Sequence, residues 1–300
     1  MCPRISAGLS GLGKRFRLFG SALVFLAGIQ GTHAQPDSEI YLIPVLPNSD
    51  SLLLGTPVNI TENPGYDNQP SFTGDGLLLY SRTRAGQTDI ARYDPGTGEL
   101  QWLSDTPGGS EYSPLPIPGT RDISAIRLDT SGLQRLYRYN SDTSRLMLKD
   151  LKVGYHLWVS PDILVCTVLT EQGMDLVVAR PGAGNAYTHQ KNVGRSLQRI
   201  PGTGRISFVA LEGGSPTLKS MDPVSGATSE ITRLPEGMQD ICWWDERTVV
   251  GGQGNALLLY RTDGDGKWTM GYRLPPGIGR ISRLALNPGG DLLALVAEPE

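Results

Sequence analysis

The sequence contains few of the side chains that usually carry enzymatic chemistry. Only three of its 300 residues are His and three are Cys, and it has no Cys-x-x-Cys or His-Glu-x-x-His pattern. Histidine is the common acid–base group near neutral pH, and these two patterns are familiar zinc-ligand spacings. We therefore expect no catalytic residue, no metal ligand set and no cofactor.

The sequence also lacks an apolar run of the roughly 20 residues that a membrane-spanning helix needs. Its N-terminal run, Leu18 to Ile29, has twelve residues. Lys14, Arg15 and Arg17 form a basic region just before it, and a Thr-His-Ala sequence ending at Ala34 follows it. This pattern is typical of a secretory signal peptide over residues 1–34. A lipid-anchored protein would carry cysteine where Ile29 stands. We expect a periplasmic or secreted protein, without a membrane span, after cleavage near Ala34.

Cleavage would leave an acidic protein. The signal contains four of the 27 basic residues and none of the 30 acidic ones, so the remainder has 23 basic residues and a net charge of −7. An acidic surface repels phosphate backbones and anionic lipid, so we expect neither nucleic acid nor membrane as a partner.

Two cysteines remain after cleavage, Cys166 in "ILVCTV" and Cys242 in "QDICWW". Both runs are apolar, so we expect two buried thiols that pack as small hydrophobic groups. A disulfide between them is the alternative in an exported chain.

Turn signals recur along the chain at a nearly fixed interval. They follow short extended segments such as "DNQPSF", and they begin at Thr73, Ile117, Val159, Ile200, Trp244 and Asn287. The steps between them are 41 to 44 residues, and the 38 Gly and 22 Pro disfavour helices. A period of this length with four short strands in each unit predicts a β-propeller.

The two ends of the chain predict how the propeller closes. The last unit, from Gly277, supplies only "RISRLAL" and "LLALVA", whereas "EIYLIPV" and "GTPVNIT" precede the first full unit. We therefore predict an all-β, six-bladed β-propeller whose last blade is completed by N-terminal strands, which leaves no open edge where the ends meet.

The predicted domain is a single propeller over residues 38–300. Its parts are a blade completion at 38–62 and repeats at 63–106, 107–153, 154–193, 194–236, 237–276 and 277–300.

The first repeat, "DNQPSFTGDGLLLYSRTRAGQTDIARYDPGTGELQWL", resembles the repeats of the TolB-type β-propellers of bacterial envelopes. Those repeats join a polar-Gln-Pro-Ser-Phe segment to a Pro-Asp-Gly turn and later an Asp-Ile-Tyr-like strand; here Gly74 replaces the proline and Ala91 the tyrosine. The second repeat, "SEYSPLPIPGT", is a fair match, and the likeness extends over roughly residues 38–300. The resemblance implies an envelope propeller that binds another envelope protein, a peptide or a glycan.

The starts of the innermost strands are the candidate binding site, because rigid strands would bring them together at one end of the central channel. The candidate residues are Asp67, Gln69, Glu111, Tyr112, Tyr155, His156, Arg195, Gln239, Asp240 and Arg280. The alternative is a polar channel lining that only binds water. His156 could bind ligand, act as an acid–base group or form a structural hydrogen bond, whereas His189 falls on a predicted outer strand.

Three functions remain open. The first is a non-catalytic, monomeric binding or scaffold propeller that holds a peptide, glycan or partner protein at the channel mouth or on a propeller face. The second is a metal-dependent lactonase or hydrolase, for which Asp67, Glu111, Asp240 and His156 are the available ligands. The third is a component of a larger envelope complex that has no ligand of its own.

Overall fold

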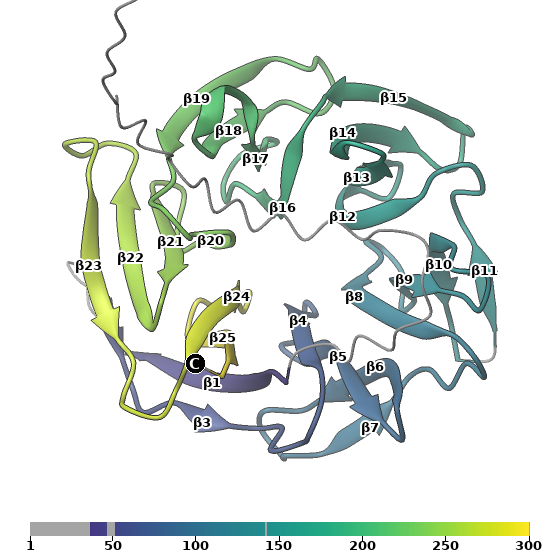
Figure 1. The fold of residues 1–300 in the computed structure, drawn as a ribbon, viewed down its shortest axis with the longest axis horizontal. Helices are drawn as coiled ribbons and strands as arrows, with labels where there is room; N and C mark the ends of the chain where they lie inside the picture. The colour runs from purple at the N-terminus through teal and green to yellow at the C-terminus, as the bar shows by residue number, and fades with distance from the viewer. Residues whose placement is uncertain (1–36, 47–51, 142, 300) are drawn as a thin grey trace, which may run out of the picture. The chain divides into compact units, whose positions relative to one another are not determined.

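The computed structural model describes residues 37–46, 52–141 and 143–299. The predicted signal peptide lies outside these residues. The described chain forms strands in six antiparallel sheets arranged as the blades of a propeller (Figure 1), together with one short 3-10 helix, η1 (Glu212–Gly214). The predicted six-bladed all-β propeller is confirmed.

Five blades are built from four consecutive strands each, numbered from the innermost strand outward. Blade 1 contains β4 (Asp67–Phe72), β5 (Leu78–Arg84), β6 (Gln87–Tyr93) and β7 (Leu100–Trp102); blade 2 contains β8 (Ser110–Pro116), β9 (Ile123–Leu128), β10 (Gln134–Tyr139) and β11 (Ser144–Leu146). Blade 3 contains β12 (Val153–Ser160), β13 (Ile163–Thr170), β14 (Gly173–Arg180) and β15 (Asn185–Gln190); blade 4 contains β16 (Val193–Arg199), β17 (Ile206–Ala210), β18 (Thr217–Met221) and β19 (Thr228–Arg233). Blade 5 contains β20 (Ile241–Trp243), β21 (Thr248–Gln253), β22 (Ala256–Arg261) and β23 (Trp268–Arg273).

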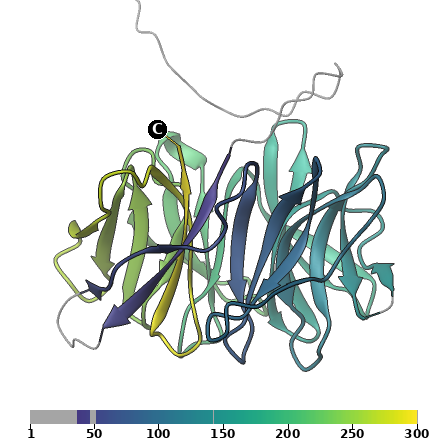
Figure 2. The same ribbon diagram turned by 90° about the horizontal axis from the view of Figure 1, so that it is seen from below.

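Blade 6 joins the two ends of the described chain. Its inner strands are β24 (Arg280–Leu286) and β25 (Leu292–Glu298), and its outer strands are β1 (Glu39–Leu46), β2 (Leu53–Leu54) and β3 (Val58–Asn59). β1 pairs with β25 from Glu39 opposite Ala297 to Pro44 opposite Leu292, and Figure 2 shows this purple strand beside the yellow one. The predicted completion of the last blade by N-terminal strands is confirmed.

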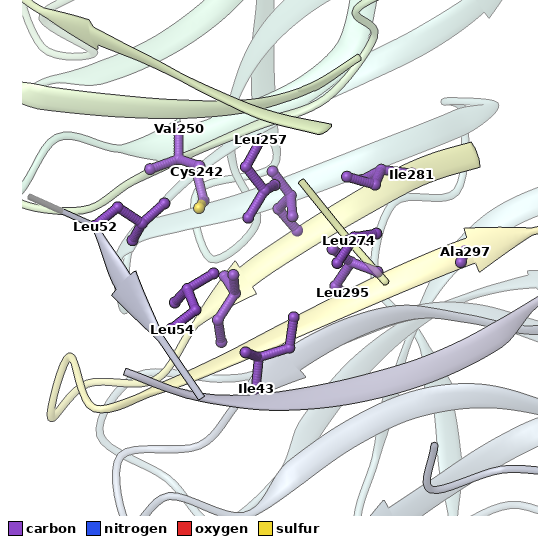
Figure 3. Packing of buried hydrophobic residues seen from close by; sticks show 12 residues of the cluster. Ile43, Leu52, Leu54, Cys242, Val250, Leu257, Leu274, Ile281, Leu295 and Ala297 are labelled. Carbon is purple, nitrogen blue, oxygen red and sulfur yellow. The ribbon is translucent and has the colours of Figure 1, made fainter. Parts of the chain in front are cut away.

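The second strand of each blade is apolar because both of its faces are buried between neighbouring blades. In β25, Leu293 and Leu295 pack with blade 5, in the cluster around Cys242 that Figure 3 shows. The intervening Ala294 and Val296 pack on the opposite side with Tyr80 of blade 1. Since side chains alternate between the faces of a strand, one continuous apolar run fills two separate spaces.

The two described cysteines, Cys166 and Cys242, are free and buried, and they belong to different clusters between blades. They pack as the small hydrophobic groups that their apolar surroundings predict. Within the described part of the chain there is no helix with the length and apolar character required to cross a membrane.

Candidate functional site

The innermost strands reach the channel with irregular backbones. The register of β4 shifts between Asn68 and Ser71, that of β8 shifts between Tyr112 and Leu115, and β12, β16 and β24 have shifts of their own. Gln69 and Ser113, the residues before the prolines of β4 and β8, have φ values of 58° and 51°. Such shifts change the direction of side chains, and proline suits a position that lacks a ladder hydrogen bond.

Gln69 connects these two irregular segments. Its Oε1 accepts a hydrogen bond from the Ser113 backbone N–H at 2.7 Å and another from Ser81 Oγ at 3.1 Å. The left-handed backbone of Gln69 therefore directs its side-chain amide toward blade 2. The resulting hydrogen bond holds blades 1 and 2 together where they meet the channel.

A cavity of about 90 Å³ lies among the innermost strands. Residues from all six blades line it, and five of the ten candidate residues are among them: Gln69, Tyr155, His156, Arg195 and Asp240. Ser113, Gln198 and Arg283 line the same cavity. The structure thus brings half of the candidate residues into one site.

Two arginines cross the channel between blades that are not neighbours. Arg195 of blade 4 donates from Nη2 to the Ser282 carbonyl of blade 6 at 2.6 Å. The Arg283 guanidinium of blade 6 lies 4.9 Å from the centre of the Tyr155 ring of blade 3. Asp240 adds the negative charge of the cavity, and its Oδ2 accepts the Leu284 backbone N–H at 3.1 Å.

These charges give the site a positive electrostatic character. Burial by itself would raise the pKa of Tyr155, but the charges of Arg283 and Arg195 outweigh burial and hold this pKa below its ordinary value. Burial, with the nearby charge of Arg283, lowers the pKa of Arg195. The site therefore favours a bound negative group over a further positive one.

Several buried polar atoms at the channel have no hydrogen-bond partner among the described residues. They are Ser113 Oγ, His156 Nδ1, Arg195 Nε and Ser282 Oγ. His156 is 5% exposed and Ser282 is 4% exposed. Buried polar atoms are nearly always satisfied by protein, water or ligand, so this group of atoms points to an occupant of the channel.

His156 also holds the wall of the channel together. Its Nε2 lies 2.8 Å from Ser124 Oγ of blade 2, which accepts the Trp158 indole N–H at 2.9 Å. Trp243 makes the same contact with Ser207, also at 2.9 Å. Burial lowers the pKa of His156 to about 3, so its ring is neutral at physiological pH.

Asp67 and Glu111 lie between blades rather than on the cavity wall. Asp67 Oδ2 accepts the Asn63 side-chain N–H at 2.9 Å, and Oδ1 is 3.8 Å from the Arg82 Nε. Glu111 Oε1 accepts hydrogen bonds from Arg127 Nε and Tyr139 OH, both at 3.0 Å. Both carboxylates therefore make structural contacts within the propeller and are not available to a ligand in the cavity.

The remaining candidate residues, Tyr112, Gln239 and Arg280, do not line the cavity. The Tyr112 ring packs edge-on against the Tyr66 ring with centroids 6.0 Å apart. Gln239 is exposed next to Asp240. Arg280 is exposed and pairs with Glu298 at the end of blade 6. His189, on the outer strand β15, contacts Thr228 Oγ1 at 3.0 Å.

The sequence pattern does not predict Arg283 or Tyr66 as residues of the site. The available signal for Arg283 was a charged residue within the otherwise apolar "RLAL" end of an innermost strand. The register shift between Ile281 and Arg283 interrupts the alternation of the strand, so counting from Arg280 does not predict which side chain faces the cavity.

Among the residues that the structure describes, no three His, Cys, Asp or Glu side chains are grouped so that they could hold a metal ion.

The fold and the site together define a six-bladed propeller with a polar, positively charged central channel. Neither models of known protein families nor sequences of curated proteins match the chain. Solved structures of the same fold include a protein from Agrobacterium tumefaciens assigned as TolB, with 16% identity and a TM-score of 0.68 over 89% of this chain and 99% of the other. TolB from Acinetobacter baumannii has 14% identity and a TM-score of 0.59 over 87% of this chain and 64% of the other.

An enzyme also shares the fold. A gluconolactonase from Xanthomonas campestris has 13% identity and a TM-score of 0.61, over 89% of this chain and 97% of the other. These likenesses establish a TolB-like propeller architecture, and a shared fold does not by itself assign a function.

Proposed function

We propose that this protein is a non-catalytic binding or scaffold propeller, and that it holds a peptide or a partner protein at the polar end of its channel. The main observation that supports this proposal is the group of buried polar atoms without hydrogen-bond partners, among them His156 Nδ1, Arg195 Nε and Ser282 Oγ. Rigid strands from different blades position these atoms, which is how a preformed recognition site is built. A glycan at the same place, or a partner on a flat propeller face, belongs to the same class of function.

We further propose that the protein works in the bacterial periplasm or is secreted. The supporting observations are the signal-like sequence over residues 1–34 and the TolB-like fold. The expected partner is accordingly another envelope protein or a peptide derived from one, and we expect the propeller itself to be a monomer.

The second candidate is a metal-dependent lactonase or hydrolase, which the fold of the Xanthomonas gluconolactonase favours. The contacts of the available ligands favour the binding function instead. Asp67 and Glu111 are each paired with an arginine between blades, and His156 Nε2 is already hydrogen-bonded to Ser124 Oγ. Of these four available ligands, only Asp240 lines the cavity and forms neither an ion pair nor a hydrogen bond with another side chain.

A capture experiment tests the proposal. The protein without residues 1–34 is immobilised and exposed to an envelope extract of its own organism, and Arg195→Gln and Tyr155→Phe are compared with wild type. Exposed Arg121→Gln removes the same charge elsewhere and is the control. We expect one partner to be captured by wild type and the control and lost from both channel variants.

Two results would overturn the proposal. Equal capture by the channel variants would exclude this end of the channel as the binding site. A stoichiometric divalent ion in the purified protein, together with lactone hydrolysis that a chelator abolishes, would establish the enzyme instead.

A further inference from the structure

The propeller contains two kinds of buried or partly buried arginine. Arg82 and Arg127, which lie between blades, each have a buried carboxylate, Asp67 at 3.8 Å and Glu111 at 3.0 Å. Arg195 and Arg283, which line the cavity, form no ion pair with any described residue. The fold therefore places a carboxyl group beside each of these two structural arginines, whereas Asp240 is the one carboxyl group among the residues that line the cavity with the channel arginines.

The charge balance of the cavity is consequently unequal. Two guanidinium groups and one carboxylate line it, which leaves one positive charge without a counter-charge. Arg283 is only 8% exposed, so water screens it poorly. An uncompensated buried charge is costly, and a bound anion would remove that cost.

Hydrogen-bonding capacity is available at the same place. Arg195 uses Nη2 for the Ser282 carbonyl, but its Nε has no partner among the described residues, and neither does the hydroxyl of Ser282. His156, 5% exposed, lines the cavity with its Nδ1 unpaired. Ser113, which does line the cavity, also has an unpartnered hydroxyl, so an anion there would find the free donors of Arg195 Nε and Ser113 Oγ.

We propose that the channel is a carboxylate-binding site, in which Arg195 and Arg283 hold an acidic side chain or the C-terminal carboxylate of a peptide. The proposal rests on the binding function proposed above and names the chemical group that this site recognises. The planar fork of a guanidinium matches the two oxygens of a carboxylate.

The cavity has room for a carboxylate, and its charge favours this group over other anions. A water molecule needs about 10–15 Å³ of such a cavity, so 90 Å³ has room for a carboxylate with its adjoining methylene and a few waters. One unmatched positive charge suits a monoanion. A phosphate with its second charge would face repulsion from Asp240.

Acetate is the probe for the test, since it is a carboxylate with one methyl group. Binding is measured at constant ionic strength by saturation transfer to the acetate methyl and by the melting temperature. Acetamide serves as the neutral analogue of the same shape, and inorganic phosphate as the other anion. We expect acetate to bind wild type, acetamide not to bind, and phosphate to bind more weakly than acetate.

Three variants test the proposal, because two of them should weaken acetate binding and the third should strengthen it. Arg195→Gln and Arg283→Gln should each weaken acetate binding by about tenfold or more, because each removes a charge-assisted hydrogen bond. Asp240→Asn should strengthen binding several-fold, because it removes the negative charge yet keeps an oxygen for the Leu284 N–H. Arg121→Gln, on the exposed surface, should leave the affinity unchanged.

If the two arginines only stabilised the propeller, the acetate affinities of the variants would differ from this expectation. Acetate affinity equal in wild type, Arg195→Gln and Arg283→Gln would overturn the carboxylate site, as would stronger binding of phosphate or no binding to Asp240→Asn. If acetate fails while Arg195→Gln still loses the captured partner, the binding function stands and this inference falls. If acetate binds as expected while the partner is captured by every variant, the carboxylate site stands and the proposed function at this channel end falls.

Discussion

Asp67 is a buried carboxylate with an incomplete set of partners, and it should make the stability of the propeller depend on pH. Its Oδ2 is bonded by Asn63, whereas Oδ1 has no hydrogen bond and only the distant Arg82. Burial raises the pKa of Asp67 from 3.8 to about 7. The protonated carboxyl therefore stabilises the fold fully below about pH 4, and this contribution is lost as the pH rises through 7.

We predict that Asp67→Asn is more stable than wild type at pH 8, by about 1–3 kcal/mol, and equally stable at pH 4. The amide keeps an oxygen for the Asn63 N–H and cannot ionise. Urea unfolding at the two pH values measures the difference, and exposed Asp162→Asn is the matched control. Lower stability of Asp67→Asn at pH 8 would show that the Arg82 ion pair dominates instead.

The Glu111–Arg127 pair should respond asymmetrically to loss of either partner. Glu111 is fully buried, so Arg127→Gln leaves a buried carboxylate with only hydroxyl donors and should lower the free energy of unfolding by about 3–5 kcal/mol. Glu111→Gln should cost less, because Arg127 keeps its contacts with the Tyr137 and Tyr139 rings and with Ser144. Denaturant unfolding of both variants tests this, and equal losses would contradict it.

At the residue scale the sequence predicts which strand carries a side chain better than where the side chain points. The positions of Tyr155, His156 and Arg195 at the start of innermost strands were enough to associate them with the channel. Arg283 could not be found in this way, because the register shift of β24 restarts the alternation of its side chains. Side-chain direction near a shift depends on backbone torsions that no residue pattern records.

At the scale of single elements, β1 is the strand on which closure of the ring depends. It covers the edge of β25, and its Ile43 packs with Leu293 and Leu295 in the cluster of Figure 3. A strand edge left open beside such an apolar surface is a template for aggregation.

We predict that a chain beginning at Asn63 aggregates or is poorly expressed, whereas one beginning at Asp37 is a monomer. Size-exclusion chromatography with light scattering distinguishes the two. A synthetic peptide of residues 37–62, added during refolding, should restore the monomer by supplying the missing strands. A shorter chain that is monomeric and melts within a few degrees of the longer one would show that closure contributes little, as expected of an open repeat array.

The lengths of the outer strands were harder to predict than their existence. "GTPVNIT" reads as a whole strand, but only Val58–Asn59 pairs with β1, as β3, and β2 comes from residues before it. Pro57 supplies no N–H for a ladder, so it shortens the strand at that end. An outer strand has one paired edge and weak burial, and its residues are correspondingly less restricted.

At the scale of the whole molecule, the number of blades and their closure follow from the repeat, because the spacing of the turns counts the sheets directly. The contents of the channel do not follow from it. Contacts such as Arg195 with Ser282 join blades that are not neighbours, and their sequence separation has no relation to the period. The repeat therefore predicts the frame of the site, and the irregular parts of the innermost strands determine its chemistry.

The pairing of β1 with β25 also sets an order of events during synthesis. Translation proceeds from the N-terminus, so Ile40, Leu42 and Ile43 leave the ribosome among the first described residues, and their partners on β25 are among the last. Blades 1 to 5 contain only local pairings and can form as they emerge, but blade 6 must wait for its final strand. Throughout elongation the apolar side chains of β1 lack their partner strand, which makes this short segment the natural site for a chaperone to protect.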